Sequence, residues 1–328
     1  MDIPKPPDNK PLNETLLRTN TSELKIPDFL FDLSQLAEKQ GQRLYLVGGA
    51  VRDLLMNCEL TDYDLLCDKN AIEFAEYLET NEKAKIDSIH KPFGTAKIKL
   101  NGFNMNGDFV NSKLVLNHDP KTRLSQSVGG ACIDLATARA ETYKFPGALP
   151  KVTFPVPVEE ELIRRDFTIN AIALLIHPKR QLEFIDPQNG IKDLSGGMIR
   201  VMHEKSYYED PTRIFRALRF AFRFGFAISE NDKKLIREVI ENKDFHGMTQ
   251  RIRGKRFGIE LKRLLELSNW LEAIKALIEM EVYKLIRPDL KLNIENPIET
   301  MLGWKEKLNW VLSLSGEASE ITKEMYLN

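Results

Sequence analysis

The sequence predicts an α+β protein in which an N-terminal part mixes strands with helices and a C-terminal part is helical. Three observations support this class. Before about residue 204, short apolar runs end at glycines and turn residues and alternate with helix-like segments. Beyond it, apolar residues recur with helical spacing and the strand patterns fade. The length of 328 residues suffices for two or three packed units, since domains typically hold about 100 to 200 residues.

The first elements follow from the periodicity of apolar residues. Phe29, Leu30, Leu33 and Leu36 recur as they would on one face of a helix. The run RLYLVGG closes on glycines, which is typical of a strand that ends in a turn. In chain order, the pattern predicts a helix at 26–40, a strand at 43–49, a short helix at 50–57, a strand at 61–68, a helix at 71–81 and a strand at 94–100.

The second half of the N-terminal part is less regular. A polar stretch at about 101–130 contains several Gly, Asn and Ser and predicts an insertion or a mobile loop. A strand is predicted at 131–139, and the four prolines of 145–157 predict a loop. A helical pattern then covers 159–176, and two short strands around a turn are expected within 181–201.

Amphipathic helices dominate the C-terminal part, and Ser229 is a plausible cap for one of them. Helices are predicted within 209–226, 229–243, 249–267 and 269–280. The chain therefore divides into a flexible tail at 1–25, a mixed head at 26–203 with the insertion at about 101–130, a helical unit at 204–268 and further helices at 269–328.

Composition excludes several classes of protein. Hydrophobic residues are 42% and charged residues 29%, as in ordinary soluble proteins, and the net charge of -1 gives no overall sign of nucleic-acid binding. The three cysteines, Cys58, Cys67 and Cys132, form no CxxC pair and imply neither a disulfide framework nor a zinc site. Without a signal peptide or an apolar run of about 18 residues, a soluble cytoplasmic protein is expected. Its oligomeric state cannot be predicted.

A glycine pair forms the first candidate binding feature. Gly48 and Gly49 end a predicted strand and open a helix, which can present backbone N–H groups to an anion. Arg52 can add a bidentate grip on a phosphate, and Asp53 could hold that arginine in place. The alternative is an ordinary strand-to-helix turn with a surface ion pair.

Paired aspartates form the second candidate feature. Asp62 and Asp64 lie at i and i+2 on a predicted strand, so their carboxylates point to the same face. Neighbouring like charges raise one another's pKa unless cations compensate, and magnesium (Mg2+) favours such oxygens together with substrate phosphates. Asp134, on a later strand, is the best candidate for a third carboxylate in a two-metal centre. The alternative is the polar face of an edge strand or a turn.

Two arginine-bearing segments follow. RRDFTIN begins with Arg164, Arg165 and Asp166 and adds Thr168 and Asn170 as small polar groups. The alternative is a solvated helix end, which RRD by itself would favour.

The segment EDPTRIFRALRFAFRFGF carries a stripe of arginines opposite an apolar face. From Glu209 to Arg263 there are 14 Lys and Arg against 8 Asp and Glu, which suits a triphosphate or a nucleic-acid backbone. A solvated helix face is the alternative, above all for TQRIRGKRFGIELKR, where Glu260 alone offsets the basic residues. The arginines of the stripe are Arg213, Arg216, Arg219 and Arg223.

Taken together, these motifs resemble the class II tRNA nucleotidyltransferase and bacterial poly(A) polymerase family. The resemblance runs from about Leu44 to Leu265 in the family's own order. It implies a polymerase-β-like palm head, then helical neck and body domains. The segments that carry it are GGAVRD, DYD, IDLATAR, RRDFTINAIA, DPQNGIKDL, EDPTRIFRALRFAFRFGF and RIRGKRFGIELKRLL.

The resemblance also implies a reaction. The 3′-hydroxyl of a tRNA would attack the α-phosphate of CTP or ATP and release pyrophosphate. Asp62 and Asp64 would bind the catalytic Mg2+ ions, and Asp134 stands where the family often has a third acidic residue.

Further residues would bind the incoming nucleotide by the same resemblance. Gly49 and Arg52 would contact it, and Asp210 and Arg213 would imitate a base-pairing partner. Such a pair is physically reasonable, because Asp supplies acceptors and Arg supplies donors. Contacts to sugar, phosphate or nucleotide are implied for Arg165, Asp166, Asn170, Arg216 and Arg219.

Two departures from the family pattern affect the expectations. The stretch at 101–130 is longer than usual between these palm strands, which weakens the placement of Asp134 beside the metals. After MEVYKLIRPDL only one or two helices remain, so either the body is truncated or primer binding is reduced.

The expected function is CCA addition to tRNA, with several alternatives. The EDxxR pattern favours base-selective addition, and no GRRF-like segment follows the paired aspartates as in bacterial poly(A) polymerases. The loop Glu141 to Pro157 is intact, which argues against a CC-only enzyme. An A-adding or CC-adding specialist and a poly(A) polymerase stay open within the enzyme class, and a non-catalytic RNA-binding relative outside it.

Overall fold

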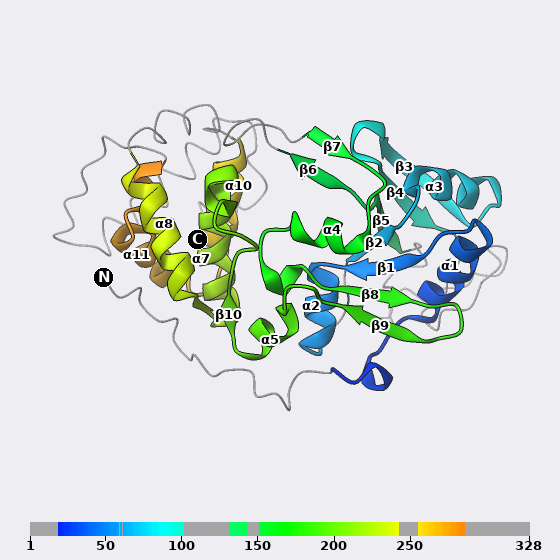
Figure 1. The fold of residues 1–328 in the computed structure, drawn as a ribbon, viewed down its shortest axis with the longest axis horizontal. Coiled ribbons are helices and arrows are strands. Elements are labelled where there is room, and N and C mark those ends of the chain that lie inside the picture. The colour runs from blue at the N-terminus through cyan, green and yellow to red at the C-terminus, as the bar shows by residue number, and fades with distance from the viewer. Residues whose placement is uncertain are drawn as a thin grey trace, which may run out of the picture.

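The computed structural model describes residues 19–58, 60, 62–101, 131–142, 151–242 and 255–285. Figure 1 shows strands β1 to β9 gathered with α1 to α4 at one side, the long helices α7, α8, α10 and α11 at the other, and α5 and β10 between them. The helices are α1 (Asp28–Lys39), α2 (Gly49–Leu55), α3 (Ala71–Thr80), α4 (Val158–Ile163), α5 (Gly190–Ser195), α6 (Ser206–Glu209), α7 (Thr212–Phe224), α8 (Glu230–Glu241), α10 (Lys255–Leu265) and α11 (Trp270–Glu279), with short 3-10 turns η2 (Thr21–Glu23), η3 (Lys91–Phe93), η4 (Thr168–Asn170) and η5 (Val282–Leu285).

A mixed sheet of seven strands forms the centre of the head, in the order β3-β4-β5-β2-β1-β8-β9. Within this sheet, the neighbouring strands β2 and β5 are parallel to each other, and every other pair of neighbouring strands is antiparallel. Its strands are β1 (Leu44–Val47), β2 (Tyr63–Cys67), β3 (Ala84–His90), β4 (Thr95–Leu100), β5 (Cys132–Thr137), β8 (Ala173–Ile176) and β9 (Leu182–Ile185). Two small sheets pair β6 (Ala140–Thr142) with β7 (Lys151–Thr153) and β10 (Met198–Ile199) with β11 (Ala227–Ile228).

The two faces of the sheet meet different partners, because alternate side chains of a strand point to opposite faces. Leu46, Leu65 and Ile98 lie in one buried core with residues of α1, α2 and α3. Tyr45 and Leu66 lie in a second cluster with residues of α4. The second face is therefore covered by α4 only over part of its width.

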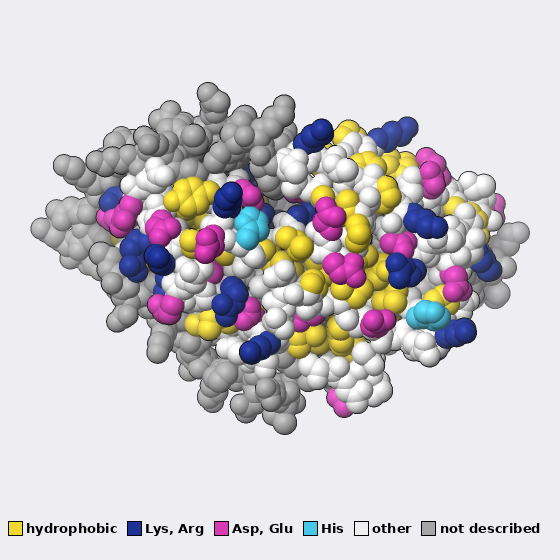
Figure 2. Space-filling model, viewed as in Figure 1, with side chains coloured by type: hydrophobic (Ala, Val, Ile, Leu, Met, Phe, Trp, Pro, Cys, Tyr) yellow, Lys and Arg dark blue, Asp and Glu magenta, His cyan; other side chains and the backbone are white. Residues whose placement is uncertain are grey.

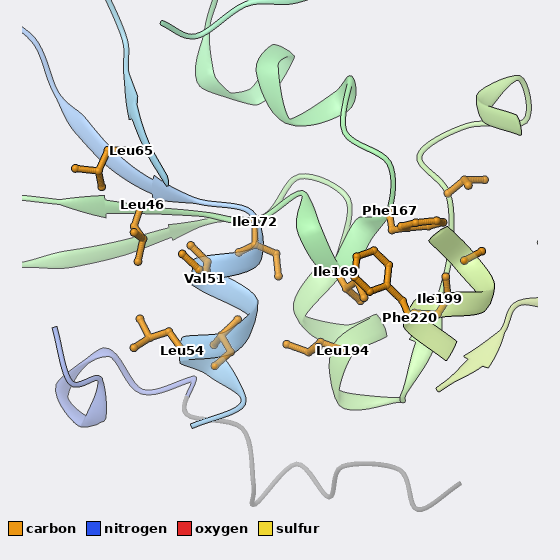
Figure 3. Close-up of a cluster of buried hydrophobic side chains, with 14 of the residues drawn as sticks. Leu46, Val51, Leu54, Leu65, Phe167, Ile169, Ile172, Leu194, Ile199 and Phe220 are labelled. Atoms are coloured by element: carbon orange, nitrogen blue, oxygen red, sulfur yellow. The ribbon is translucent and has the colours of Figure 1, made fainter. Parts of the chain in front are cut away.

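The apolar core continues from the head into the helical part. Figure 3 shows Val51 and Leu54 of α2 near Leu46 and Leu65, and Phe167, Ile169 and Ile199 near Phe220 of α7. The rings of Phe167 and Phe220 meet edge to face at 5.7 Å between centroids. The head and α7 thus share one hydrophobic core.

Polar anchors reinforce the same junction. Asp232 of α8 is fully buried and accepts hydrogen bonds from the Val201 backbone N–H at 2.9 Å and the Tyr207 hydroxyl at 2.8 Å. The Ser229 hydroxyl accepts from the Asp232 N–H, so the predicted cap of this helix is confirmed. Burial and the neighbouring Asp232 raise the pKa of Tyr207 well above its usual range.

The α+β class is confirmed, but several predicted elements are wrong. The helix predicted across 159–176 ends at Ile163, and its second half forms η4 and β8. The run AIALLI is apolar throughout, because strand β8 is buried on both faces. The spacing of apolar residues in such a run cannot distinguish a strand from a helix. The strand β3 was not predicted, because it has only partial alternation and a bulge between Ile86 and Ser88.

Two further corrections concern loops. Residues 151–153 form β7 within the predicted loop 145–157, because the prolines lie outside the three residues that pair with β6. Within 181–201 the helix α5 lies between the two predicted strands, where only a turn was expected. The insertion predicted at 101–130, apart from residue 101, and residues 1–18 of the tail predicted at 1–25 lie outside the described residues. The last part of that predicted tail contains η2. Across the described ranges, no helix is both long enough and apolar enough for a membrane span.

Candidate functional site

Carboxylates gather on the sheet face that α4 covers only in part. Asp64 of β2 stands in register with Asp134 of β5, so the two side chains point to the same face. Burial and the charges of Asp134 and Asp62 raise the pKa of Asp64, against the opposing effect of Arg165 and Lys97. Lys97 of β4 is in register with Asp134, and its ammonium lies 3.6 Å from that carboxylate. The charge of Asp64 is therefore incompletely compensated by its neighbouring cations.

These carboxylates suit Mg2+ in kind but do not form a closed metal cage. Among the residues that the structure describes, no three His, Cys, Asp or Glu side chains are grouped as a metal site. Asp62 lies one residue before β2, so the predicted pair is not wholly within the strand. Protein sites for Mg2+ commonly use one or two carboxylates with substrate phosphates, and Asp62 and Asp64 fit that requirement.

The glycine pair lies at the start of α2, as predicted. Gly48 has φ +71°, and a Cβ there would lie 2.4 Å from Nη1 of Arg165, so only glycine fits. The Gly48 N–H donates to the carbonyl of Ile172 at 3.2 Å. The space over Gly48 thus admits a guanidinium of this chain, while Gly49 begins the helix.

Arg52 lies inside the junction between head and neck. Its Nε and Nη2 donate to Oδ1 of Asp53 at 2.8 and 2.7 Å, which confirms that Asp53 holds this arginine. Its Nη1 donates to Oδ1 of Asn170 at 2.6 Å. The guanidinium lies 5.4 and 4.8 Å from the ring centroids of Phe220 and Phe224 in α7. Arg52 therefore connects the glycine turn to the neck.

Glu161 of α4 holds two further arginines. It is fully buried and accepts from Nη2 of Arg164 at 2.5 Å and from Nη2 of Arg165 at 3.1 Å. Nη1 of Arg165 donates to the Asn170 carbonyl at 3.5 Å, and its buried Nε has no hydrogen-bond partner in the described part of the chain. Burial lowers the pKa of Arg165, against the charge of Glu161.

The carboxylate of Asp166 links the head to the neck helix α7 through Arg216. Its Oδ1 accepts from Asn170 at 3.0 Å and its Oδ2 from Nε of Arg216 at 2.8 Å. Burial would raise the pKa of Asp166, but Arg216 and Asn170 hold it below its usual range. On the other side, Nη1 of Arg216 donates to Glu260 of α10 at 3.2 Å. We call this series of contacts the head–neck relay. It runs from Arg52 through Asn170, Asp166 and Arg216 to Glu260.

The arginine stripe of α7 is only partly exposed. Arg213 and Arg219 are 6% and 8% exposed, whereas Arg223 is exposed, so the predicted cationic face meets water over only part of its length. Arg219 donates to Glu260 at 3.1 Å, and the two Nη groups of Arg213 donate to the carbonyls of Ser206 and Arg164 at 3.3 Å each. Burial is possible because carboxylates and carbonyls match these charges.

Asp210 is held separately from Arg213. Its Oδ1 accepts from the N–H and the hydroxyl of Thr212 at 3.1 and 2.6 Å. Its Oδ2 forms an ion pair with Arg256 of α10. The predicted base-reading pair therefore has no side-chain contact between its two members among the described bonds.

A cavity of about 550 Å³ opens between head and neck. Of the residues predicted for the site, five line it: Arg165, Asp166, Asp210, Arg213 and Arg216. Sequence reasoning assigned no role to the others, which are Glu141, Arg164, Thr212, Arg256, Ile259, Glu260 and Arg263. The remaining predicted residues, which are Gly48, Gly49, Arg52, Asp53, Asp62, Asp64, Asp134, Asn170 and Arg219, are not among its described lining residues.

A signal for the missed residues was present in the sequence. Arg256, Glu260 and Arg263 recur at i, i+4 and i+7, which places them on one face of α10. Glu260 accepts from Arg263 at 2.9 Å in addition to the two arginines of α7. Glu260, a single carboxylate within the basic segment, thus indicated a buried side chain that pairs with arginines.

Comparison with known proteins adds to this geometry. Residues 44–200 match the family model described as the poly A polymerase head domain. The chain is 33% identical to the A-adding tRNA nucleotidyltransferase of Aquifex aeolicus over an alignment of 268 residues. The alignment covers 82% of this chain and 28% of that protein. It therefore spans less than a third of that relative's length.

Solved structures are similar over most of this chain. The Thermotoga maritima CCA-adding enzyme complexed with tRNA_CCA aligns with a TM-score of 0.65 and 32% identity, covering 89% of this chain and 60% of that one. A tRNA nucleotidyltransferase complexed with a primer tRNA and an incoming ATP analog aligns with a TM-score of 0.64 and 30% identity, covering 88% and 71%.

Proposed function

This chain belongs to the class II tRNA nucleotidyltransferase family, and on that premise we propose that it adds C, A or both to the 3′ end of tRNA from CTP and ATP. The polymerase-β-like head expected from the sequence is confirmed by the same likenesses. The observation that carries the proposal is the arginine-lined cavity between head and neck, with Arg165 linking it electrostatically to Asp64.

The reaction is proposed to form a bond between the RNA 3′-oxygen and the α-phosphorus and to break the bond to pyrophosphate. Asp62 and Asp64 would hold Mg2+, which supplies charge neutralisation and activation of the attacking oxygen when bound. Asp134 faces Asp64 across the strand pair and adds to the negative potential that favours cation binding.

The cavity arginines are proposed to bind the triphosphate. Arg164, Arg165 and Arg216 enter it from the head and the neck. Arginine matches phosphate oxygens through several donors in a planar fork. Their carboxylate partners Glu161 and Glu260 keep the guanidinium groups in place before the anion arrives.

Base selection is proposed to use Asp210 and Arg213. Arg213 uses two described donors on backbone carbonyls, and a guanidinium offers five N–H groups. Asp210 keeps acceptor capacity beyond its bonds to Thr212 and Arg256. A buried polar site of this kind discriminates by leaving the groups of a wrong base unpaired.

An A-adding specialist is the second candidate, because the Aquifex aeolicus relative at 33% identity carries that name. The two differ in the RNA end that they extend. A CCA-adding enzyme extends tRNA that lacks all three terminal nucleotides, whereas an A-adding enzyme extends only tRNA that already ends in CC.

The deciding experiment is incorporation of labelled CTP and ATP into tRNA transcripts that end before, within and after CC, with Mg2+ present. We expect addition that stops after the terminal A. Incorporation of A alone into tRNA ending in CC would establish the A-adding function. Long A-tails on unrelated RNA would indicate a poly(A) polymerase, and no incorporation on any transcript would favour a non-catalytic RNA-binding protein.

A further inference from the structure

Exposed lysines continue the carboxylate face of the sheet beyond Asp134. Lys97 of β4 is in register with Asp134, and Lys99 lies two residues further on the same face. Lys85 of β3 is in register with Lys99, so these two side chains stand directly opposite each other. We call Lys85, Lys97 and Lys99 the lysine face.

The charge arrangement of the lysine face is unusual for an isolated sheet. Like charges directly opposite each other on neighbouring strands destabilise the pair. Lys85 and Lys99 are both exposed, and no ion pair to either is formed among the described residues. Lys97 alone has a carboxylate partner, Asp134, at 3.6 Å. An anion on this face would relieve the repulsion.

Several described side chains on this part of the face are exposed, among them Lys85 and Lys99. Cys132 of β5 is exposed and stands in register with Lys99 on the side away from Lys85. By strand spacing and rise, Lys99 lies about 12 Å from Asp64, two strands across and two residues along. An extended polyanion could therefore lie over the lysines with its end at the carboxylates.

Binding of the nucleotide in the cavity does not account for the position of these lysines. None of the three lines the cavity between head and neck, where the described arginines are gathered. A triphosphate bound there is served by guanidinium groups, whereas the lysine face begins on the other side of Asp134. The anion that suits it is a chain of phosphates that reaches the carboxylates from the sheet edge.

We propose that the lysine face binds the phosphodiester backbone of the RNA primer next to its 3′ end. This inference rests on the proposed function for the identity of the primer. Lysine serves as a point charge without base specificity, so the face would hold the strand in place and contribute nothing to the choice of nucleotide. Its contribution to binding is electrostatic and falls as salt rises.

The first test reverses the charges that lie away from Asp134. The double variant K85E/K99E should raise the Kd of the protein for tRNA lacking its 3′ end by about tenfold and flatten the salt dependence of binding. Its KM for ATP and its kcat at saturating tRNA should stay unchanged. The neutral variant K85Q/K99Q should show a smaller shift in the same direction, and it replaces the reversal if that variant unfolds.

Lys39→Glu is the matched control, because Lys39 is exposed on α1, which packs against the opposite face of the sheet. It should bind tRNA like the unmodified protein. An unchanged tRNA Kd in K85E/K99E would overturn the inference, as would a raised KM for ATP with an unchanged Kd for tRNA. Direct binding needs no catalysis, so it decides the inference even if no nucleotide is incorporated, which would count against the proposed function alone.

A second test uses Cys132 as a reporter. In a Cys58→Ser background, Cys132 is the exposed thiol of the described residues, since Cys67 is buried. Bound tRNA should slow its alkylation by a maleimide, and ATP alone should not. Protection by ATP and none by tRNA would assign the face to the nucleotide and contradict the proposal.

Discussion

The sheet face and the cavity treat charge in opposite ways. On the sheet face, Asp134 remains 59% exposed, and burial with neighbouring carboxylates raises the pKa of Asp64. In the cavity, the side chains of Glu260 and Arg213 are 8% and 7% exposed, and both are hydrogen-bonded. The carboxyl of Asp64 is incompletely compensated by cations, whereas the cavity has its cations already fixed. The first suits a site completed by its substrates, and the second suits a preformed recognition site.

The largest effect should come from the sheet face. Asp64→Asn removes a proposed Mg2+ ligand and should lower the rate of nucleotide addition by at least about a hundredfold. The fold should be kept or stabilised, because a like charge next to Asp134 is removed. Incorporation assays and thermal unfolding measure the two effects. Glu73→Gln, at an exposed position of α3 beneath the other face, is the control, and retained activity in D64N would refute the assignment.

Removing the buried carboxylate of Glu260, which lines the cavity, should instead damage the fold. Glu260→Ala leaves Arg216 and Arg219 without their shared partner, and it should lower the free energy of unfolding by about 2 to 4 kcal/mol. Urea denaturation measures the loss. Glu230→Ala removes an ion pair whose carboxylate side chain is 88% exposed and should change little. Equal losses in both variants would show that the cavity network is no more than surface pairing.

The head–neck relay can be tested at its buried first member. Arg52→Lys keeps the charge but loses the fork that reaches Asp53 and Asn170 together, and it should cost about 1 to 3 kcal/mol. The rate of addition should fall more than the affinity for tRNA, because the glycine turn loses its link to the neck. Arg43→Lys, at a mostly exposed pair with Asp68, serves as the control. Full activity in R52K would separate the relay from catalysis.

The smallest effect concerns pH. The pKa of Asp166 is held below its usual value of 3.8, so the unfolded chain binds its proton more readily than the folded protein does. Its contribution to stability is full above pH 3.8 and is lost as the pH falls through the lower folded pKa. Urea denaturation at several pH values below 5 should show a shallower loss in D166N than in the unmodified protein. Parallel curves would contradict this role of Asp166.

Much of the sheet and its site was predictable from local pattern. The glycine turn, the strand with Asp64, the strand with Asp134 and the neck helix each follow from spacing within a few residues. What spacing could not give is the register that sets Asp64 opposite Asp134, because strand partners are determined by tertiary packing. The metal role of these residues stays a prediction.

The cavity was less predictable, because its residues come from distant segments. The pairing of Asp166 with Arg216 spans 50 residues, and that of Asp210 with Arg256 spans 46. Periodicity placed the arginines on one face of α7 but could not say whether water or Glu260 would meet them. The burial of Arg219 could not be predicted from the charges of α7 alone, because its partner Glu260 belongs to α10.

The junction drawn in Figure 3 also determines how the molecule must unfold. Phe167, Ile199 and Phe220 belong to one core, although they come from both sides of the expected boundary near residue 203. A fragment cut at that boundary would expose an apolar surface that water penalises, so it should aggregate instead of folding alone. The head and neck then melt together, and a single cooperative heat-absorption peak would be the calorimetric signature of the part they share.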